Sequence, residues 1–275
     1  MKGFKIIALL AVLMGLFVGN ARASEIIASA DVVDAPTVVG LGIAMIPDYV
    51  GSDDYKAVPL PFFKYTFNNS QRYIKLSGPE LSLNLLNHPN LYFGPVVRFY
   101  GSRDDDIEDD VVKKMRKIDA GLAAGAFLTF EVKEAEPRNR INFTLKLLAD
   151  VSDSYGGYSL DLDASLWRKV AQRWDAFVGV GTTYADGDYM DTYFGVNNGN
   201  RGSATVLELP NYSAGSGIRD IRVQAGAIYY YDKNWLFGGL VRAQALLGDA
   251  EDSPVVDSRG DPNQMTLAIF AAYRW

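Results

Sequence analysis

Strict alternation of apolar and polar residues over long runs is the feature of this sequence that most constrains its fold. The clearest run is the one in which Tyr158, Leu160, Leu162, Ala164 and Leu166 alternate with Ser159, Asp161, Asp163 and Ser165. Neighbouring side chains of a β-strand point to opposite faces, so this run predicts a strand with one apolar and one polar face. Two aspartates on one face are unfavourable in a β-sandwich core, but they fit a wall with lipid outside and water inside.

Similar runs recur along the chain and are about 10 to 14 residues long, longer than the usual globular strand. A tilted strand that crosses a bilayer needs about 9 to 11 residues. We therefore predict an all-β, transmembrane, antiparallel up-and-down barrel over residues 37–275. Its twelve predicted strands are 37–46, 56–67, 72–77, 80–86, 91–101, 118–132, 141–152, 158–170, 173–184, 217–231, 235–247 and 264–275.

The strand count depends on the segment 72–86, which Gly78 and Pro79 divide. If this segment forms one strand, the total is eleven. A closed antiparallel barrel with both termini on one side needs an even number. A barrel of ten strands is the alternative, if the segment lies partly outside the wall.

The connections between the predicted strands alternate between short and long, as in outer-membrane barrels with short periplasmic turns and long outer loops. The short and intermediate connections are 68–71, 87–90, 134–140, 171–172 and 232–234. The long connections are 47–55, 102–117, 185–216 and 248–263.

The N-terminus has the order of a secretory signal. Lys2 and Lys5 precede the uncharged apolar run 6–18, and Ala21-Arg22-Ala23 is an A-x-A cleavage site. We expect cleavage after Ala23, which leaves 24–36 as a periplasmic segment before the barrel and places the protein in a Gram-negative outer membrane. The alternative is an uncleaved anchor helix, although the apolar run is short for one.

The last predicted strand ends the chain on an aromatic residue. Its apolar face is Leu267, Ile269, Ala271, Tyr273 and Trp275. This pattern is typical of the signal by which outer-membrane barrels are recognised by their assembly machinery, with Tyr273 and Trp275 as the signal residues. The alternative is an ordinary buried edge strand.

Composition excludes several classes of site. The chain has no cysteine, so a thiolate site, an iron–sulfur cluster and a disulfide framework are ruled out. A net charge of −6 without a basic patch argues against a nucleic-acid partner. The only histidine, His88, lies in a predicted periplasmic turn, where it suits neither a Ser-His hydrolase nor a zinc site. We expect no catalytic activity and no cofactor.

Charged residues on the polar faces of the strands are candidate lumen residues. They are Arg98, Asp119, Glu131, Lys146, Asp150, Asp161, Asp163, Arg222 and Arg242. One interpretation is a polar pore or solute site with a transverse field. The other, which we favour for a narrow barrel, is a network of salt bridges and hydrogen bonds, because charges in a small interior usually pair.

The outer loop 102–117 separates its charges, with an acidic run 104–110 followed by a basic run 113–117. A divalent cation or lipopolysaccharide phosphates are possible ligands, but the spacing is not that of an EF-hand. We favour a solvated loop. The stretch 195–203, rich in glycine and asparagine, predicts a flexible surface loop rather than a phosphate-binding site.

A distinctive stretch follows the first predicted strand. It contains Pro47, Asp48, Tyr49, Gly51, Ser52, Asp53 and Tyr55, and Pro59-Leu60-Pro61 comes next. This P-x-Y-x-G-S-x-x-Y loop with a P-L-P strand resembles the MipA/OmpV family of outer-membrane proteins, as do Gly94-Pro95 and the terminal aromatic residue. The loop 47–55 is either an interaction site or a structural loop with local backbone bonds and interface tyrosines.

The resemblance implies a role without implying a reaction. It suggests a scaffold that links a lytic transglycosylase, MltA, to a murein synthase, with outer-membrane lipid and lipopolysaccharide around the barrel. Other members of the family are described as porin-like proteins or adhesins. The alternatives to a scaffold are therefore a narrow channel for small solutes and a surface adhesin or receptor.

Overall fold

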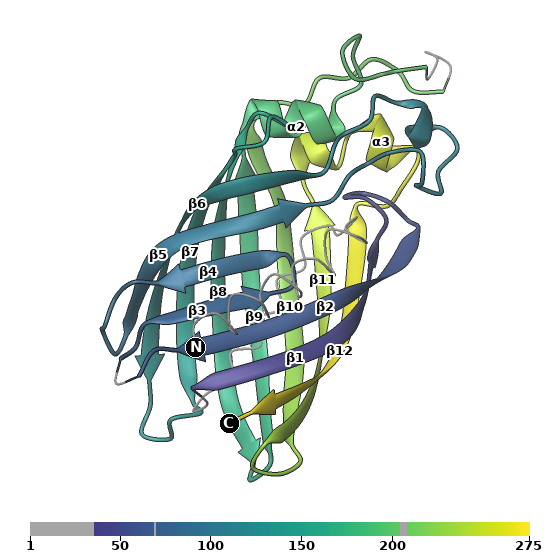
Figure 1. Cartoon of the computed structure of the whole chain (residues 1–275). Helices are drawn as coiled ribbons and strands as arrows, with labels where there is room; N and C mark the ends of the chain where they lie inside the picture. The colour runs from purple at the N-terminus through teal and green to yellow at the C-terminus, as the bar shows by residue number, and fades with distance from the viewer. Residues whose placement is uncertain (1–35, 69, 204–207) are drawn as a thin grey trace, which may run out of the picture.

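The computed structural model describes residues 36–68, 70–203 and 208–275. The predicted signal peptide 1–23 and the segment 24–35 lie outside these residues. The described part of the chain forms twelve antiparallel strands that close into a barrel (Figure 1). Each strand pairs with its neighbours in the sequence, and β1 pairs with β12 to complete the wall. The predicted fold class is confirmed, and the ten-strand alternative is wrong.

The observed strands begin and end within three residues of the predicted ones. They are β1 (Thr37–Pro47), β2 (Tyr55–Thr66), β3 (Tyr73–Ser77), β4 (Glu80–Asn84), β5 (Leu91–Tyr100), β6 (Gly121–Lys133), β7 (Arg140–Asp150), β8 (Tyr158–Ala171), β9 (Trp174–Ala185), β10 (Gly217–Tyr230), β11 (Trp235–Leu246) and β12 (Asn263–Arg274).

Alternation along each strand separates an exposed apolar outer face from a buried inner face. In β1, Leu41 and Ile43 are about half exposed, whereas Val38 and Ala44 are buried. Large exposed apolar side chains of this kind occur on nearly every long strand. On the outside of a barrel they are the surface that lipid covers.

The segment that decides the strand count forms a short hairpin. β3 and β4 have five residues each, and Gly78 turns between them with a φ of 55°. β4 pairs with β5 over only three residue pairs. The barrel wall is therefore shorter along the strand direction at β3 and β4 than at the other strands. Gly78-Pro79 separates two strands, which gives the even strand number that a closed antiparallel barrel needs.

The short turns and the C-terminus lie at the same end of the barrel, which is the periplasmic end of this fold type (Figure 1). Aromatic side chains form contacts near this rim. Trp174 lies 4.9 Å from Tyr229, and Tyr273 lies 5.2 Å from Trp235 and 5.6 Å from Trp275, measured between ring centroids. These positions are typical of an interfacial aromatic belt.

The opposite end carries structure that the sequence did not predict. The connection 186–216 contains the helix α2 (Gly187–Phe194), and 247–262 contains η2 (Gly248–Ala250) and α3 (Pro254–Asp257). The connection 101–120 contains the turn η1 (Val112–Lys114). Asp186 accepts a hydrogen bond from the Tyr189 N–H and begins α2, as an N-cap residue does. No helix among the described residues is long and apolar enough to span a membrane.

Candidate functional site

Two adjoining regions contain the candidate functional residues. The inner-wall network consists of Glu80, Arg98, Lys146, Asp161, Asp163, Thr183, Arg219, Asp220 and Arg222, on strands β4, β5 and β7 to β10. The outer cap consists of the long outer connections 48–54, 101–120, 186–216 and 247–262, so far as the structure describes them.

The first half of the inner-wall network is centred on Arg98 and Glu80. The Nε and Nη2 groups of Arg98 donate to Glu80 Oε2 at 3.2 and 2.8 Å, and Nη2 also donates to Asp161 Oδ2 at 2.8 Å. Lys146 Nζ donates to both oxygens of Glu80, at 2.7 and 2.9 Å. Four strands are thus joined across the inner wall by charge-assisted hydrogen bonds.

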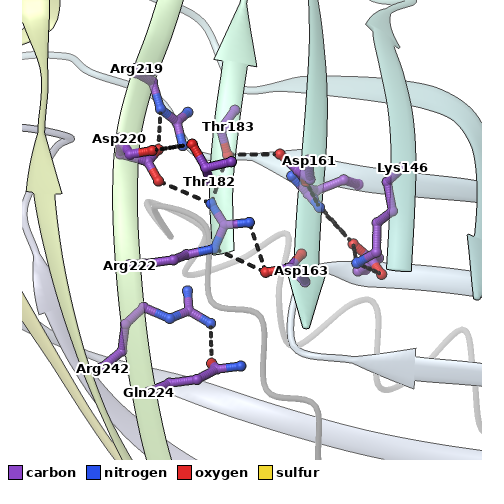
Figure 2. A network of polar contacts seen from close by, with 12 residues as sticks. Lys146, Asp161, Asp163, Thr182, Thr183, Arg219, Asp220, Arg222, Gln224 and Arg242 are labelled. Atoms are coloured by element: carbon purple, nitrogen blue, oxygen red, sulfur yellow. Dashed lines mark hydrogen bonds and ion pairs between the residues drawn. The ribbon is translucent and has the colours of Figure 1, made fainter. Parts of the chain in front are cut away.

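The second half is centred on Arg222 of β10. Its Nε and Nη2 groups donate to Asp163 Oδ1 at 3.2 and 2.9 Å, and Nη1 donates to Asp220 and to the Thr183 hydroxyl at 3.0 and 2.7 Å. Thr183 donates to Asp161 at 2.9 Å and so joins the two halves (Figure 2). Arg219 donates to Asp220 from Nε and Nη2, at 2.8 and 2.6 Å.

The network is electrically balanced. Its four carboxylates are Glu80, Asp161, Asp163 and Asp220, and its four cations are Arg98, Lys146, Arg219 and Arg222. All except Asp163 are at most 9% exposed. Buried ions are tolerated when they are paired and hydrogen-bonded, and removing one partner leaves an uncompensated charge. The geometry is therefore that of the paired network, the second of the two interpretations above.

Close packing against a glycine shapes this network. A Cβ atom on Gly181 of β9 would lie 2.2 Å from Asp163 Oδ1 and 2.8 Å from Arg222 Nε. Only glycine at position 181 leaves room for the hydrogen bonds between Arg222 and Asp163.

Five of the nine predicted lumen charges lie in this network, namely Arg98, Lys146, Asp161, Asp163 and Arg222. Arg242 lies nearby on β11 and donates to Gln224 at 3.0 Å (Figure 2). Glu131 lies at the periplasmic end of β6, where it accepts a hydrogen bond from Tyr92 at 2.8 Å and lies 3.4 Å from Arg140.

Two predicted lumen charges lie elsewhere. Asp119 is exposed in the outer connection, because β6 begins only at Gly121. Asp150 ends β7 and accepts hydrogen bonds from the N–H groups of Tyr155 and Gly156 at 2.7 and 2.8 Å. It therefore stabilises the turn 151–157 rather than a solute path.

Three charged members were missed by the sequence analysis. Glu80, Ser82 and Asn84 alternate with Leu81 and Leu83, so the signal for Glu80 on the inner face was available. Arg219 and Asp220 are adjacent, so simple alternation places them on opposite faces. A register shift between Ile218 and Asp220 breaks the alternation, and both side chains are fully buried.

The predicted interaction loop 47–55 is mostly buried within the outer cap. Asp48 accepts from the Glu108 N–H at 3.0 Å and lies 2.9 Å from Lys56 Nζ. The Tyr49 hydroxyl donates to Arg259 O at 3.3 Å, and burial raises the pKa of this phenol above its usual value, with nearby Asp109 adding to the shift.

The same loop is also bonded to the last outer connection. Gly51 O accepts from the Asp261 N–H at 3.0 Å, and Ser52 O accepts from Gln264 Nε2 at 3.1 Å. The Tyr55 hydroxyl accepts from the Met265 N–H at 3.0 Å. Asp53 and Tyr55 are the exposed members of this motif, so its contacts are those of the structural interpretation.

The charged side chains of the acidic connection 101–120 are mostly exposed, as a solvated loop predicts, but its backbone and its apolar residues are folded into the cap. Asp109 pairs with Arg259 at 2.7 Å and accepts from the Val111 and Val112 N–H groups. Ion pairs also join Asp105 to Lys117 and Asp110 to Lys113. Its apolar residues Ile107, Val112 and Met115 pack with Tyr49, Val196, Leu209 and Val255.

No group of three or more acidic or histidine residues in the described chain could hold a metal ion.

The stretch 195–203 is bonded to the rest of the cap. Asn200 O accepts from the Arg116 N–H at 2.9 Å, and Asn197 Nδ2 donates to Asp191 at 2.7 Å. Its composition predicts a flexible surface loop, and Asn198, Gly199, Gly202 and Ser203 are exposed.

Four tyrosines, two of them on α2 of the outer cap, pack together next to the inner-wall network. Tyr155 lies 5.4 Å from Tyr100 and 5.1 Å from Tyr189, and Tyr189 lies 4.6 Å from Tyr193, between ring centroids. The Tyr189 hydroxyl accepts from Arg219 Nη1 at 2.5 Å. The cap is thus connected to the charged inner wall through these tyrosines.

Comparison with known families identifies the chain. The family model described as "MltA-interacting protein MipA" matches residues 39–275, which is nearly all of the described barrel. This protein belongs to the MipA family. The resemblance seen in the first loop and second strand is confirmed, and with it the assignment to the outer membrane.

Solved structures with a similar fold are other outer-membrane barrels. An outer membrane channel from Pseudomonas putida F1 has 10% sequence identity, with 91% of this chain and 100% of that chain covered and a TM-score of 0.49. The translocator domain of the autotransporter NalP from Neisseria meningitidis has 8% identity, coverage of 100% and 97%, and a TM-score of 0.43. No curated protein matches this MipA-family chain.

Proposed function

We propose that this MipA-family barrel is a non-enzymatic scaffold that binds an MltA-type lytic transglycosylase, and with it a murein synthase, at the periplasmic face of the outer membrane. The single observation that carries the proposal is the family match over residues 39–275, whose description names an MltA-interacting protein. Export through a signal cleaved after Ala23 belongs to the same proposal, and N-terminal sequencing of the membrane form should begin at Ser24.

The charged groups and the loop motif of the described residues make contacts within the barrel. The inner-wall carboxylates are held in ion pairs, and the Pro47–Tyr55 motif is occupied by contacts within the cap. His88 is exposed in a periplasmic turn, and its Nδ1 accepts the N–H of Asn90 at 3.2 Å. Each of these groups supports the structure of the barrel through its observed contacts.

The periplasmic rim is the surface that a murein enzyme could reach. Arg173 and Lys233 are exposed there, in the turns before β9 and β11, and neither forms an ion pair with a described residue. Both turns are short, so a docking surface built on them is small. Exposed cations on such a surface favour an acidic partner face and increase the rate of encounter.

Affinity recovery from mild detergent tests the scaffold proposal. The full-length protein is mixed with a purified lytic transglycosylase and a murein synthase, and retention of each enzyme is measured. The wild type should retain the transglycosylase, and R173E/K233E should retain less. R116E/K113E changes two cations of the outer cap instead and should behave as the wild type. Recovery of neither enzyme by a correctly folded barrel would contradict the proposal.

A narrow channel for small solutes is the second candidate. The row of alternating charges on the inner wall favours it, because charged lumen side chains tune ion selectivity where water passes. Planar-bilayer recordings decide between the two candidates. Reproducible unit conductance that D161N alters would support a channel, and silence across salts and voltages would remove it.

A further inference from the structure

Arg103 is a buried cation of the outer cap. It lies at the start of the connection 101–120, where its backbone N–H and C=O pair with Ile118 at 2.9 Å. Its side chain is 4% exposed. Nη1 donates to Tyr193 O, in the last turn of α2, at 2.8 Å. The Nε and Nη2 atoms of Arg103 are buried and have no hydrogen-bond partner.

These two atoms form one edge of the guanidinium group, the edge that binds a carboxylate side-on. Four other arginines of this protein use that edge in this way. The pairs are Arg98 with Glu80, Arg219 with Asp220, Arg222 with Asp163, and Arg259 with Asp109. The same Nε–Nη2 edge of Arg103 forms no hydrogen bond and no ion pair with a carboxylate of the described chain.

Three acidic residues of the surrounding cap are already engaged. Asp48 is held by Lys56 and the Glu108 N–H, Asp109 by Arg259, and Asp191 by Asn197. The carbonyl at the end of α2 offers only a partial negative charge. Burial lowers the pKa of Arg103 to about 10, with nearby Tyr49 and Tyr193 opposing the shift, so Arg103 is still charged at neutral pH.

A buried charge without a partner is costly, and buried arginines in proteins are paired. We propose that the Nε–Nη2 edge of Arg103 is a receptor for an oxyanion, a carboxylate or a phosphate group, bound in the outer cap between the connection 101–120 and the end of α2. The fork of two parallel N–H groups matches the two oxygens of such an anion. The bound anion ties the connection 101–120 to α2 and stabilises the cap. The proposal does not depend on the scaffold function.

Titration calorimetry on the full-length barrel in detergent tests this site. The probes are sodium acetate and inorganic phosphate, with chloride at equal ionic strength as the reference, and purified lipopolysaccharide in a separate arm. Acetate or phosphate should give saturable binding that chloride does not. If lipopolysaccharide alone binds in an Arg103-dependent way, the oxyanion is its phosphate or carboxylate group.

Three variants separate the fork from the charge. R103Q should abolish oxyanion binding, and R103K, which keeps the charge without the fork, should weaken it at least about tenfold. R116Q removes an exposed arginine of the same connection and should bind as the wild type. Heat-modifiable migration on gels establishes that each variant is folded.

Hydrogen exchange gives a second measurement that does not require a tight ligand. Acetate or phosphate should slow amide exchange in 101–118 of the wild type and leave R103Q unchanged. Equal effects of all the anions in the wild type, or equal binding by folded R103Q, would overturn the proposal.

Discussion

At the residue scale, the balanced charges of the inner-wall network make its stability sensitive to single changes. D161N removes one of four carboxylates and leaves Arg98 and Thr183 with a weaker partner. Because the site is buried, we expect a loss of about 3–5 kcal/mol in the free energy of unfolding. Urea unfolding in lipid vesicles measures it. The double variant R98M/D161N restores the balance and should lose less than the sum of the single variants, whereas simple additivity would contradict a coupled network.

Gly181 provides a second test at this scale. G181A places a methyl group within 2.2 Å of Asp163 Oδ1, so Asp163 and Arg222 must separate. We expect a destabilisation of about 1–3 kcal/mol, typical of overpacking. G217A is the matched control, because a Cβ atom on Gly217 meets nothing within 4 Å. Equal stability of the two variants would show that the network does not require this contact.

The alternating pattern of the sequence could predict only those network residues that follow it. Asp161, Asp163 and Arg222 follow period two, and the sequence places them correctly on the inner face. Arg219 and Asp220 are brought to the same side by a register shift, which depends on pairing with β9 and leaves no mark in the local sequence. Asp119 was wrongly placed because the strand was predicted to begin three residues too early, and strand ends are the least predictable part of an element.

At the scale of elements, the loop 47–55 joins the first hairpin to the last outer connection. Gly51 has a φ of 98°, and a Cβ atom there would lie 2.5 Å from Val256 Cγ2. G51A should therefore loosen the cap while leaving the barrel closed. Limited proteolysis should cut the outer connections of G51A several-fold faster than those of the wild type. G187A, at the start of α2, should be cut at the wild-type rate, and an unchanged G51A pattern would contradict this role of the loop.

Alkaline pH should open the same cap. Burial raises the pKa of Tyr212 to about 12, with Asp249 adding to the shift, and its hydroxyl donates to Asp249 O at 3.0 Å. The folded state favours the neutral phenol. The stabilisation that the neutral Tyr212 hydroxyl gives the folded state is therefore complete below the pKa of the unfolded state, about 10. It is lost as the pH rises through the folded-state pKa of about 12. Phenolate absorbance followed together with proteolysis should show this loss, and Y212F should reduce the pH dependence.

The helices of the outer cap could not be read from the sequence. α2 has eight residues and α3 has four, and each packs its apolar side chains against residues distant in the chain. Short helices of this kind depend on tertiary packing more than on propensity. Asp186 and Ser253 are N-cap residues that signal helix starts, but loops rich in aspartate and serine contain many such candidates.

At the scale of the whole molecule, the strand number and the gathering of the short turns at one end followed from the sequence, because they depend on alternation, parity and loop length. Assembly is the property that remains to be tested at this scale. Removing the terminal aromatic residues with Y273A/W275A should reduce the heat-modifiable barrel recovered from outer membranes by several-fold. W235A removes a neighbouring rim aromatic instead and should assemble as the wild type. Normal assembly of the double variant would argue against a C-terminal signal.

In the proposed scaffold, this MipA-family barrel binds a murein enzyme through its periplasmic rim. The most direct test is titration of a purified MltA-type lytic transglycosylase onto the barrel in lipid nanodiscs, where both faces are accessible. We expect saturable binding that R173E/K233E weakens and R116E/K113E leaves unchanged. Absence of binding to the folded wild-type barrel, or equal binding by R173E/K233E, would contradict it.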